Sequence, residues 1–76
     1  MTRLPRDVSD AQHPELTSRE LQVVQLMARR RSTTQIAAAM SITVNTVRTR
    51  AHHAERKLGA VSRDEATQTA RDRGII

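Results

Sequence analysis

Apolar residues recur at every third or fourth position along most of this chain, a spacing typical of short amphipathic helices. The spacing is clearest in residues 43–59. The apolar stripe of that segment consists of Val47, Ala51, Ala54 and Leu58. The opposite side carries only polar residues, which are Asn45, Arg48, Thr49, His52 and Arg56. Because this side offers hydrogen-bond donors and no acid, it suits a surface of acceptors and phosphates, such as the major groove of DNA.

Four capping signals divide the chain into four predicted helices. In the first, the Thr17 hydroxyl can accept a hydrogen bond from the Glu20 amide while the Glu20 carboxylate reaches back, which makes a capping box. Similar signals stand at Ser32, Thr43 and Ser62. The predicted helices cover residues 17–29, 33–40, 44–58 and 62–73. The sequence therefore predicts an all-α fold of four short helices.

The second and third predicted helices are separated only by residues 41–43. A turn of that length between two amphipathic helices is the helix-turn-helix arrangement, which places the second helix of the pair in the major groove of DNA. This arrangement predicts that the polar side of residues 44–58 contacts DNA.

The composition limits the size and stability of the domain. A chain of 76 residues forms one domain at most, and a domain this small buries only about 60% of its unfolded surface. Phe, Trp, Tyr and Cys are all absent, so the core must consist of aliphatic residues and no disulfide can support it. Residues 1–14 contain Pro5 and Pro14 and lack a sustained period. We expect a disordered arm or linker there and a single domain over residues 15–76.

The charge balance indicates a polyanion as partner. The formal net charge is +5, and 12 of the 13 basic residues are Arg, which favours nucleic acid over an anionic membrane. A helix on a membrane surface would need large apolar residues, which the Ala-rich stripe lacks. No segment approaches the roughly 20 apolar residues needed to span a bilayer, and none resembles a signal peptide. We expect no membrane partner and a cytoplasmic, nucleoid-associated location.

Several short motifs resemble one known family. They are LTSRE at residues 16–20, the IA pair at 36–37, the TV pair at 46–47, and RKLG followed by SR and Ala at 56–66. Together they make the segment from Leu16 to Ile76 similar to the DNA-binding domain of the LuxR/GerE family of bacterial transcription regulators. The resemblance implies a four-helix LuxR-type helix-turn-helix domain whose third helix reads duplex DNA and whose fourth usually mediates dimerisation.

The resemblance also implies roles for individual residues. Those expected to contact bases are Arg48, Thr49, His52 and Asn45. Those expected to contact phosphates are Thr33, Thr34, Thr46, Arg50, Arg56 and Lys57. A dimer interface would include Ala66, Thr69, Ala70 and Arg73. Within the first group, Arg48 is the expected guanine reader, because its planar fork can bond O6 and N7 together.

The chain departs from the family pattern in ways that alter these expectations. Arg30 takes the place of a usual glycine, and it would destabilise the folded domain by roughly 1 kcal/mol if the backbone there needs a positive φ. Arg50 replaces a common His and adds charge. Ala51 and Ala54 take the places of large aliphatic residues, so the core under the third helix contains smaller apolar side chains. The fourth helix is polar, so we expect a domain that is monomeric without DNA and dimerises on a two-fold operator.

Rival functions remain open at this point. Catalysis is not expected, because no nucleophile and base are paired in the sequence. No cofactor or metal is expected either, because His52 and His53 point about 100° apart on a helix. The main alternative is a helix-turn-helix module that binds RNA polymerase, a sigma factor or another regulator. Either a stand-alone regulator or the C-terminal part of a longer one is compatible with the sequence.

Overall fold

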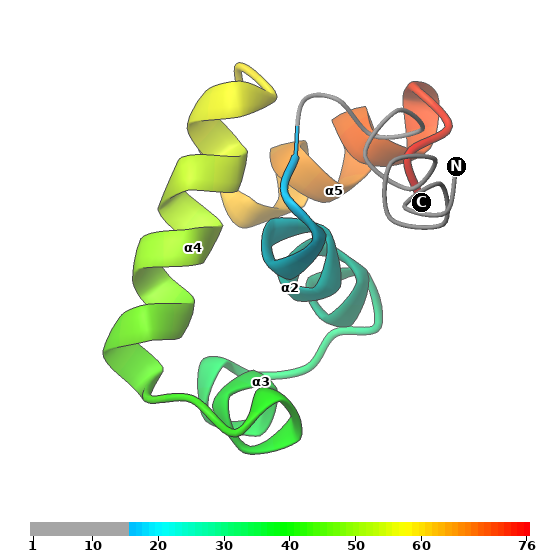
Figure 1. Cartoon of the computed structure of the whole chain (residues 1–76). Coiled ribbons are helices and arrows are strands. Elements are labelled where there is room, and N and C mark those ends of the chain that lie inside the picture. Colours follow the sequence, from blue (N-terminus) through cyan, green and yellow to red (C-terminus); the bar gives the residue numbers. More distant parts are fainter. Residues whose placement is uncertain (1–15) are drawn as a thin grey trace, which may run out of the picture.

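The computed structural model of the chain describes residues 16–76, which form α-helices joined by short loops (Figure 1). The helices are α2 (Ser18–Ala28), α3 (Thr33–Met40), α4 (Val44–Lys57) and α5 (Arg63–Asp72). Residues 16–76 contain no strand, so the predicted all-α fold is confirmed, and each helix lies within one residue of its expected bounds. The arm or linker predicted for residues 1–14 lies outside the described residues.

Every helix starts with the predicted hydroxyl cap. At α2 the Glu20 amide donates to Thr17 Oγ1 (3.1 Å) and the Thr17 amide donates to Glu20 Oε1 (2.9 Å), which completes the capping box. The same reciprocal pair joins Ser32 and Gln35 at α3. At α4 and α5 the reciprocal bond is absent, and Thr43 and Ser62 each accept from the amide three residues later. These bonds satisfy amide groups that the first turn of a helix leaves without partners.

Each of the four helices in residues 16–76 is followed by a residue with positive φ, and two of these residues are not glycine. Gly59 (φ 68°) and Gly74 (φ 72°) adopt this left-handed conformation without strain. Arg30 (φ 63°) and Ser41 (φ 57°) adopt it although they carry a Cβ atom, which raises the free energy by about 1–2 kcal/mol each. The expectation that Arg30 occupies a position suited to glycine is therefore confirmed, whereas the positive φ of Ser41 was not predicted.

The core lies where α4 meets the other helices. α4 contacts α2, α3 and α5, and α2 also contacts α3 and α5 (Figure 1). The buried apolar side chains are Leu16, Val23, Val24, Met27, Ile36, Ala37, Met40, Val47, Ala51, Ala54, Leu58, Ala60, Ala66 and Ala70. They include the whole predicted stripe of α4. Nearly half of the core is alanine, and small side chains of this kind allow helices to approach closely.

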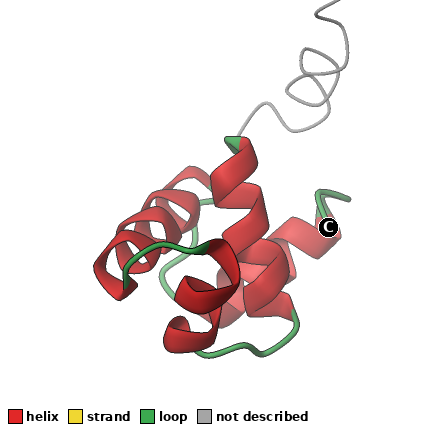
Figure 2. Cartoon of the chain, turned by 60° about the horizontal axis from the view of Figure 1, so that its bottom comes forward, coloured by secondary structure: helices red, strands yellow, loops and turns green. Residues whose placement is uncertain are grey.

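The turn between α3 and α4 fixes the helix-turn-helix pair (Figure 2). The Ile42 amide donates to the Ala37 carbonyl (3.0 Å) and the Ser41 amide donates to the Ala38 carbonyl (3.3 Å). This pairing is the Schellman arrangement, which reverses the chain directly after a helix. Ile42 packs against the core beside Val44. The turn that leads into α4 is therefore held by both backbone bonds and apolar contacts.

Candidate nucleic-acid interface

One side of α4 is exposed along its whole length. The side chains on it are Asn45, Arg48, Thr49, His52 and Arg56, and all are exposed. We call these residues the reading face. The opposite stripe is buried, with Val47 and Ala54 fully enclosed. The division into an apolar side and a donor-rich side is thus confirmed, and the burial of Val47 and Ala54 fixes the rotation of the reading face about the helix axis.

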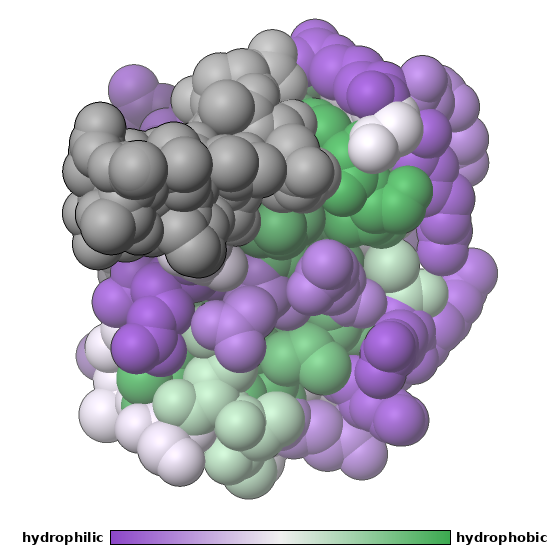
Figure 3. Space-filling view, turned by 45° about the vertical axis from the view of Figure 1, so that its right-hand side comes forward, coloured by the Kyte–Doolittle hydropathy of each residue, from purple (hydrophilic) through white to green (hydrophobic). Residues whose placement is uncertain are grey.

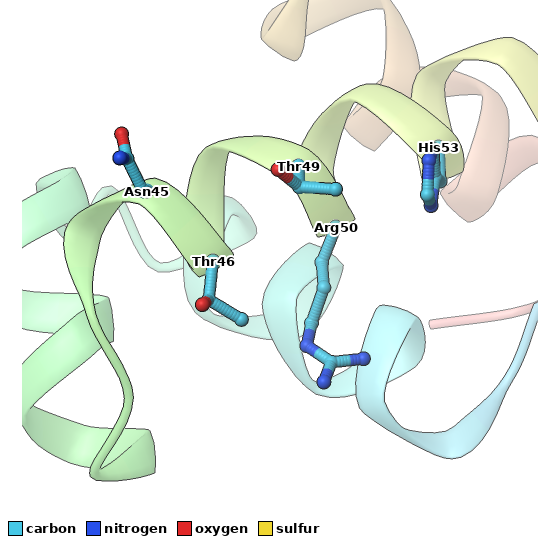
Figure 4. Close-up of a pocket in the computed structure, with 5 residues that line it drawn as sticks. All are labelled: Asn45, Thr46, Thr49, Arg50 and His53. Carbon is cyan, nitrogen blue, oxygen red and sulfur yellow. The ribbon is translucent and has the colours of Figure 1, made fainter.

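A second row of polar side chains runs along α4 next to the reading face. It consists of Thr46, Arg50, His53 and Lys57, which we call the flank. Residues three or four positions apart lie on the same side of a helix, so these four form one continuous row. In Figure 4, Thr46 and Arg50 project from α4 on the side opposite to Asn45, and Arg50 extends toward α2.

Two shallow hollows open along the flank. One has a volume of about 290 Å³ and is lined by Asn45, Thr46, Thr49, Arg50 and His53 (Figure 4). The other has a volume of about 330 Å³ and is lined by His53, Arg56 and Lys57. Among the described residues, no acid lines either hollow, although Lys57 of the second one is paired with the Glu20 carboxylate. Each hollow thus offers cationic side chains to an anion.

The C-terminal end of α4 is tied to the first turn of α2 by a buried carboxylate. Glu20, only 5% exposed, accepts hydrogen bonds at Oε1 from Lys57 Nζ (2.8 Å) and from the Thr17 amide (2.9 Å). Its other oxygen lies 4.0 Å from His53 Nδ1. Burial alone would raise the pKa of Glu20, but the hydrogen bond and charge of Lys57, with the bonds from Thr17, lower it below its ordinary value. The charged pair holds the last turn of α4 against α2.

Comparison with known proteins agrees with this geometry. The model of the luxR family of bacterial regulatory proteins, GerE, matches residues 14–70. The chain belongs to this family. No curated protein and no solved structure gave a significant match. Membership makes the chain a DNA-binding domain of the transcription-regulator class, built on a LuxR-type helix-turn-helix, a kind of domain that regulates rather than catalyses.

Within this LuxR-type domain, the start of α3 lies beside α5. Thr33 is half-buried, and its hydroxyl accepts a hydrogen bond from Arg63 Nη2 (2.9 Å). Thr34 is exposed next to it. Both were expected to contact phosphates, and the free amides at a helix N-terminus favour anions. Arg63 brings an additional positive charge to this end of α3.

The fourth helix of the LuxR-type domain, α5, faces the core with two of its four expected interface residues. Ala66 and Ala70 are fully buried among the core side chains, and a contact of theirs with a second copy stays a prediction. Thr69 is half-buried and Arg73 is exposed. On the face turned forward in Figure 3, a band of hydrophilic side chains separates the visible hydrophobic areas.

The two adjacent histidines of α4 lie on different rows. His52 belongs to the reading face, and His53 belongs to the flank. Among residues 16–76, no three His, Asp or Glu side chains lie close enough to hold a metal ion. In the same part of the chain, no helix has the length and apolar character needed to cross a membrane.

Two features of the site were missed in the sequence. Glu20 was assigned only to the cap of α2, although it also receives Lys57 from α4. His53 was not assigned to any role, although it lines both hollows. A signal for His53 was present, because it lies three residues after Arg50 and four before Lys57. The Glu20–Lys57 contact had no local signal, because it depends on the packing of two helices.

Proposed function

We propose that residues 15–76 form the DNA-binding domain of a bacterial transcription regulator that binds duplex DNA sequence-specifically, with α4 in the major groove. The observation that carries this proposal is the reading face, an uninterrupted exposed row of donors on a helix whose other side is buried. A helix of this kind fits the major groove, whose base edges present acceptors. The regulator would act on the bacterial nucleoid.

Base recognition is proposed for the first three turns of the reading face. Arg48 can donate two parallel hydrogen bonds to O6 and N7 of guanine. The Thr49 methyl group can contact the methyl group of thymine, while Asn45 and His52 can bond to neighbouring base edges. All four side chains are exposed on one side of α4, which supports this assignment.

Phosphate binding is proposed for residues beside the reading face and for Arg56, its last member. They are Thr33 and Thr34 at the start of α3, with Thr46, Arg50, Arg56 and Lys57 on α4. Lys57 differs from the others, because its ammonium group already pairs with Glu20. With 42% of its side chain exposed, it can still add positive potential at the edge of the groove.

A homodimer is proposed only on DNA. Thr69 and Arg73 are the two expected interface residues at or near the surface of α5. With Ala66 and Ala70 committed to the core, the remaining contact would be small and polar. Two copies would then be brought together mainly by half-sites about one helical turn apart.

Selection of duplexes from a random library tests the proposal. The wild-type chain is expected to enrich one motif, because the reading face distinguishes base pairs. A variant carrying Arg48→Ala and Thr49→Ala serves as the control, since both side chains are exposed and their loss should leave the core intact. If the wild type and this variant recover the same mixture of duplexes with no enriched motif, the proposal is contradicted. It would instead favour the module that binds RNA polymerase, a sigma factor or another regulator.

A further inference from the structure

The flank of α4 has a feature that base reading does not explain. Its two hollows share a single side chain, His53, which lines both. Arg50 stands on one side of His53, and Lys57 and Arg56 stand on the other. This part of α4 is therefore cationic on each side of a histidine, and no acid is among the described residues that line the hollows.

Arg50 supplies an independent sign that the first hollow receives an anion. Its Nε atom is buried and has no acceptor in the described part of the chain. A buried N–H group without an acceptor is unfavourable, and a guanidinium group is well suited to bond with phosphate oxygens. Arg50 and His53 both line this hollow, and in Figure 4 the guanidinium group of Arg50 extends from α4 toward α2. The side chain would gain a partner by turning outward to an anion in the hollow.

His53 lines both hollows, and its ring lies next to the carboxylate of Glu20. Its Nδ1 lies 4.0 Å from Glu20 Oε2, and 53% of its side chain is exposed. The two ring nitrogens of histidine act separately, so Nε2 remains for another acceptor. When the ring is protonated, it can interact with Glu20 through Nδ1 and donate to an anion through Nε2.

We propose that the two hollows bind consecutive phosphates of one DNA strand, and that His53 between them is a phosphate-binding residue in its protonated form. This inference rests on the proposed function and adds a residue that it does not include. Arg50 would bind the phosphate in one hollow, Arg56 would bind the next, and His53 would reach both.

The inference requires DNA binding to take up a proton. Glu20 is the charged group that α2 presents to His53. On α4 itself, Arg50, Arg56 and Lys57 are its cationic neighbours, and two phosphates bound in the hollows would bring negative charge to the ring. Affinity for DNA should therefore rise as the pH falls through the range in which histidine titrates.

The first experiment measures Kd at constant salt between about pH 8 and pH 6. A duplex of scrambled sequence is used, so that base reading contributes little. Wild-type affinity should rise about three- to tenfold over this range, since one proton taken up can change affinity by at most about tenfold per pH unit. His53→Gln should abolish most of this rise. An undiminished rise in His53→Gln would overturn the inference.

The second experiment uses the wild-type chain and does not depend on a variant. Single phosphates of the selected duplex are replaced in turn by neutral methylphosphonates. Two adjacent replacements on one strand should each weaken binding several-fold, and they should remove the pH dependence. If the pH dependence survives every replacement, the inference fails while DNA binding itself stands. If the wild type binds no duplex at all, the proposed function fails.

Discussion

Glu20 in α2 and Lys57 in α4 are 37 residues apart in the sequence and are joined by a hydrogen-bonded ion pair of 2.8 Å. The carboxylate is buried, and it also accepts from the amide of its own N-cap residue, Thr17. The start of one helix and the end of another are thus fixed by a single side chain. Because α4 carries the reading face, this pair also contributes to the direction in which that face points.

Glu20→Gln should lower the free energy of unfolding by about 1–3 kcal/mol at neutral pH, since it weakens a hydrogen bond between charged groups. The pKa of Glu20 is lowered in the folded chain, so its contribution is complete above the ordinary value of 4.5 and is lost as the pH falls through the lower, folded value. The difference between wild type and variant in urea unfolding should therefore shrink in acid. Glu65→Gln is the control, because Glu65 occupies the same position in α5 but is exposed. A difference that stays constant with pH would contradict this account.

Arg30→Gly should stabilise the domain by roughly 1 kcal/mol, because glycine adopts the positive φ of this position without strain. In a domain of this size, 1 kcal/mol corresponds to a rise in Tm of about 4–8 °C. Arg31→Gly is a matched control that removes the same charge at a position without positive φ. Thermal unfolding of both variants separates the backbone effect from the charge. Equal changes in the two variants would show that conformational strain at Arg30 is not the cause.

Arg50→Met should weaken DNA binding without weakening the fold. Methionine keeps an unbranched stem of similar length against α2 and removes the buried Nε that lacks an acceptor. Removal of an unsatisfied buried donor is neutral or stabilising. We expect the free energy of unfolding to stay within about 0.5 kcal/mol of the wild type or to rise, while the affinity for duplex DNA falls. A clear loss of stability in urea unfolding would indicate that Arg50 serves the core instead.

Arg48→Ala and Arg56→Ala should affect DNA binding differently, although both remove an exposed Arg from the same face of α4. Arg48 lies nearer the start of α4, where base edges are reached, so its loss should cost about 1–3 kcal/mol on the selected duplex and relax the preference at one base pair. Arg56 lies two turns further on, where its loss should weaken all duplexes about equally and reduce the salt slope by about one. Binding of both variants to the selected and scrambled duplexes distinguishes the two roles. An unchanged ratio between the duplexes in Arg48→Ala would refute its assignment as a reader.

The helix boundaries were predictable because they depend on neighbours in the sequence. Each N-cap bond joins residues three positions apart, so Thr17, Ser32, Thr43 and Ser62 could be identified directly. The end of α3 could not, because a serine with positive φ has no distinctive sequence pattern. Only the surrounding Schellman bonds keep Ser41 in that conformation.

The candidate site was predictable to the extent that it lies on one helix. The spacing along residues 44–58 gave the reading face and the buried stripe behind it. Contacts between helices could not be predicted from the spacing within one helix. The pairing of Lys57 with Glu20 of α2 is such a contact. Ala66 and Ala70 show the same limit. Their spacing marks one side of a helix, but it does not say whether that side meets the chain's own core or another molecule.

Titration of DNA binding with salt tests the central claim, that α4 binds duplex DNA, most directly. The binding constant of the wild-type chain is measured on the selected and the scrambled duplex at several salt concentrations. We predict that its logarithm falls linearly with the logarithm of salt, with a slope of about −0.9 for each phosphate neutralised, and that the selected duplex binds more tightly throughout. A slope near zero on both duplexes, with no preference between them, would contradict the claim.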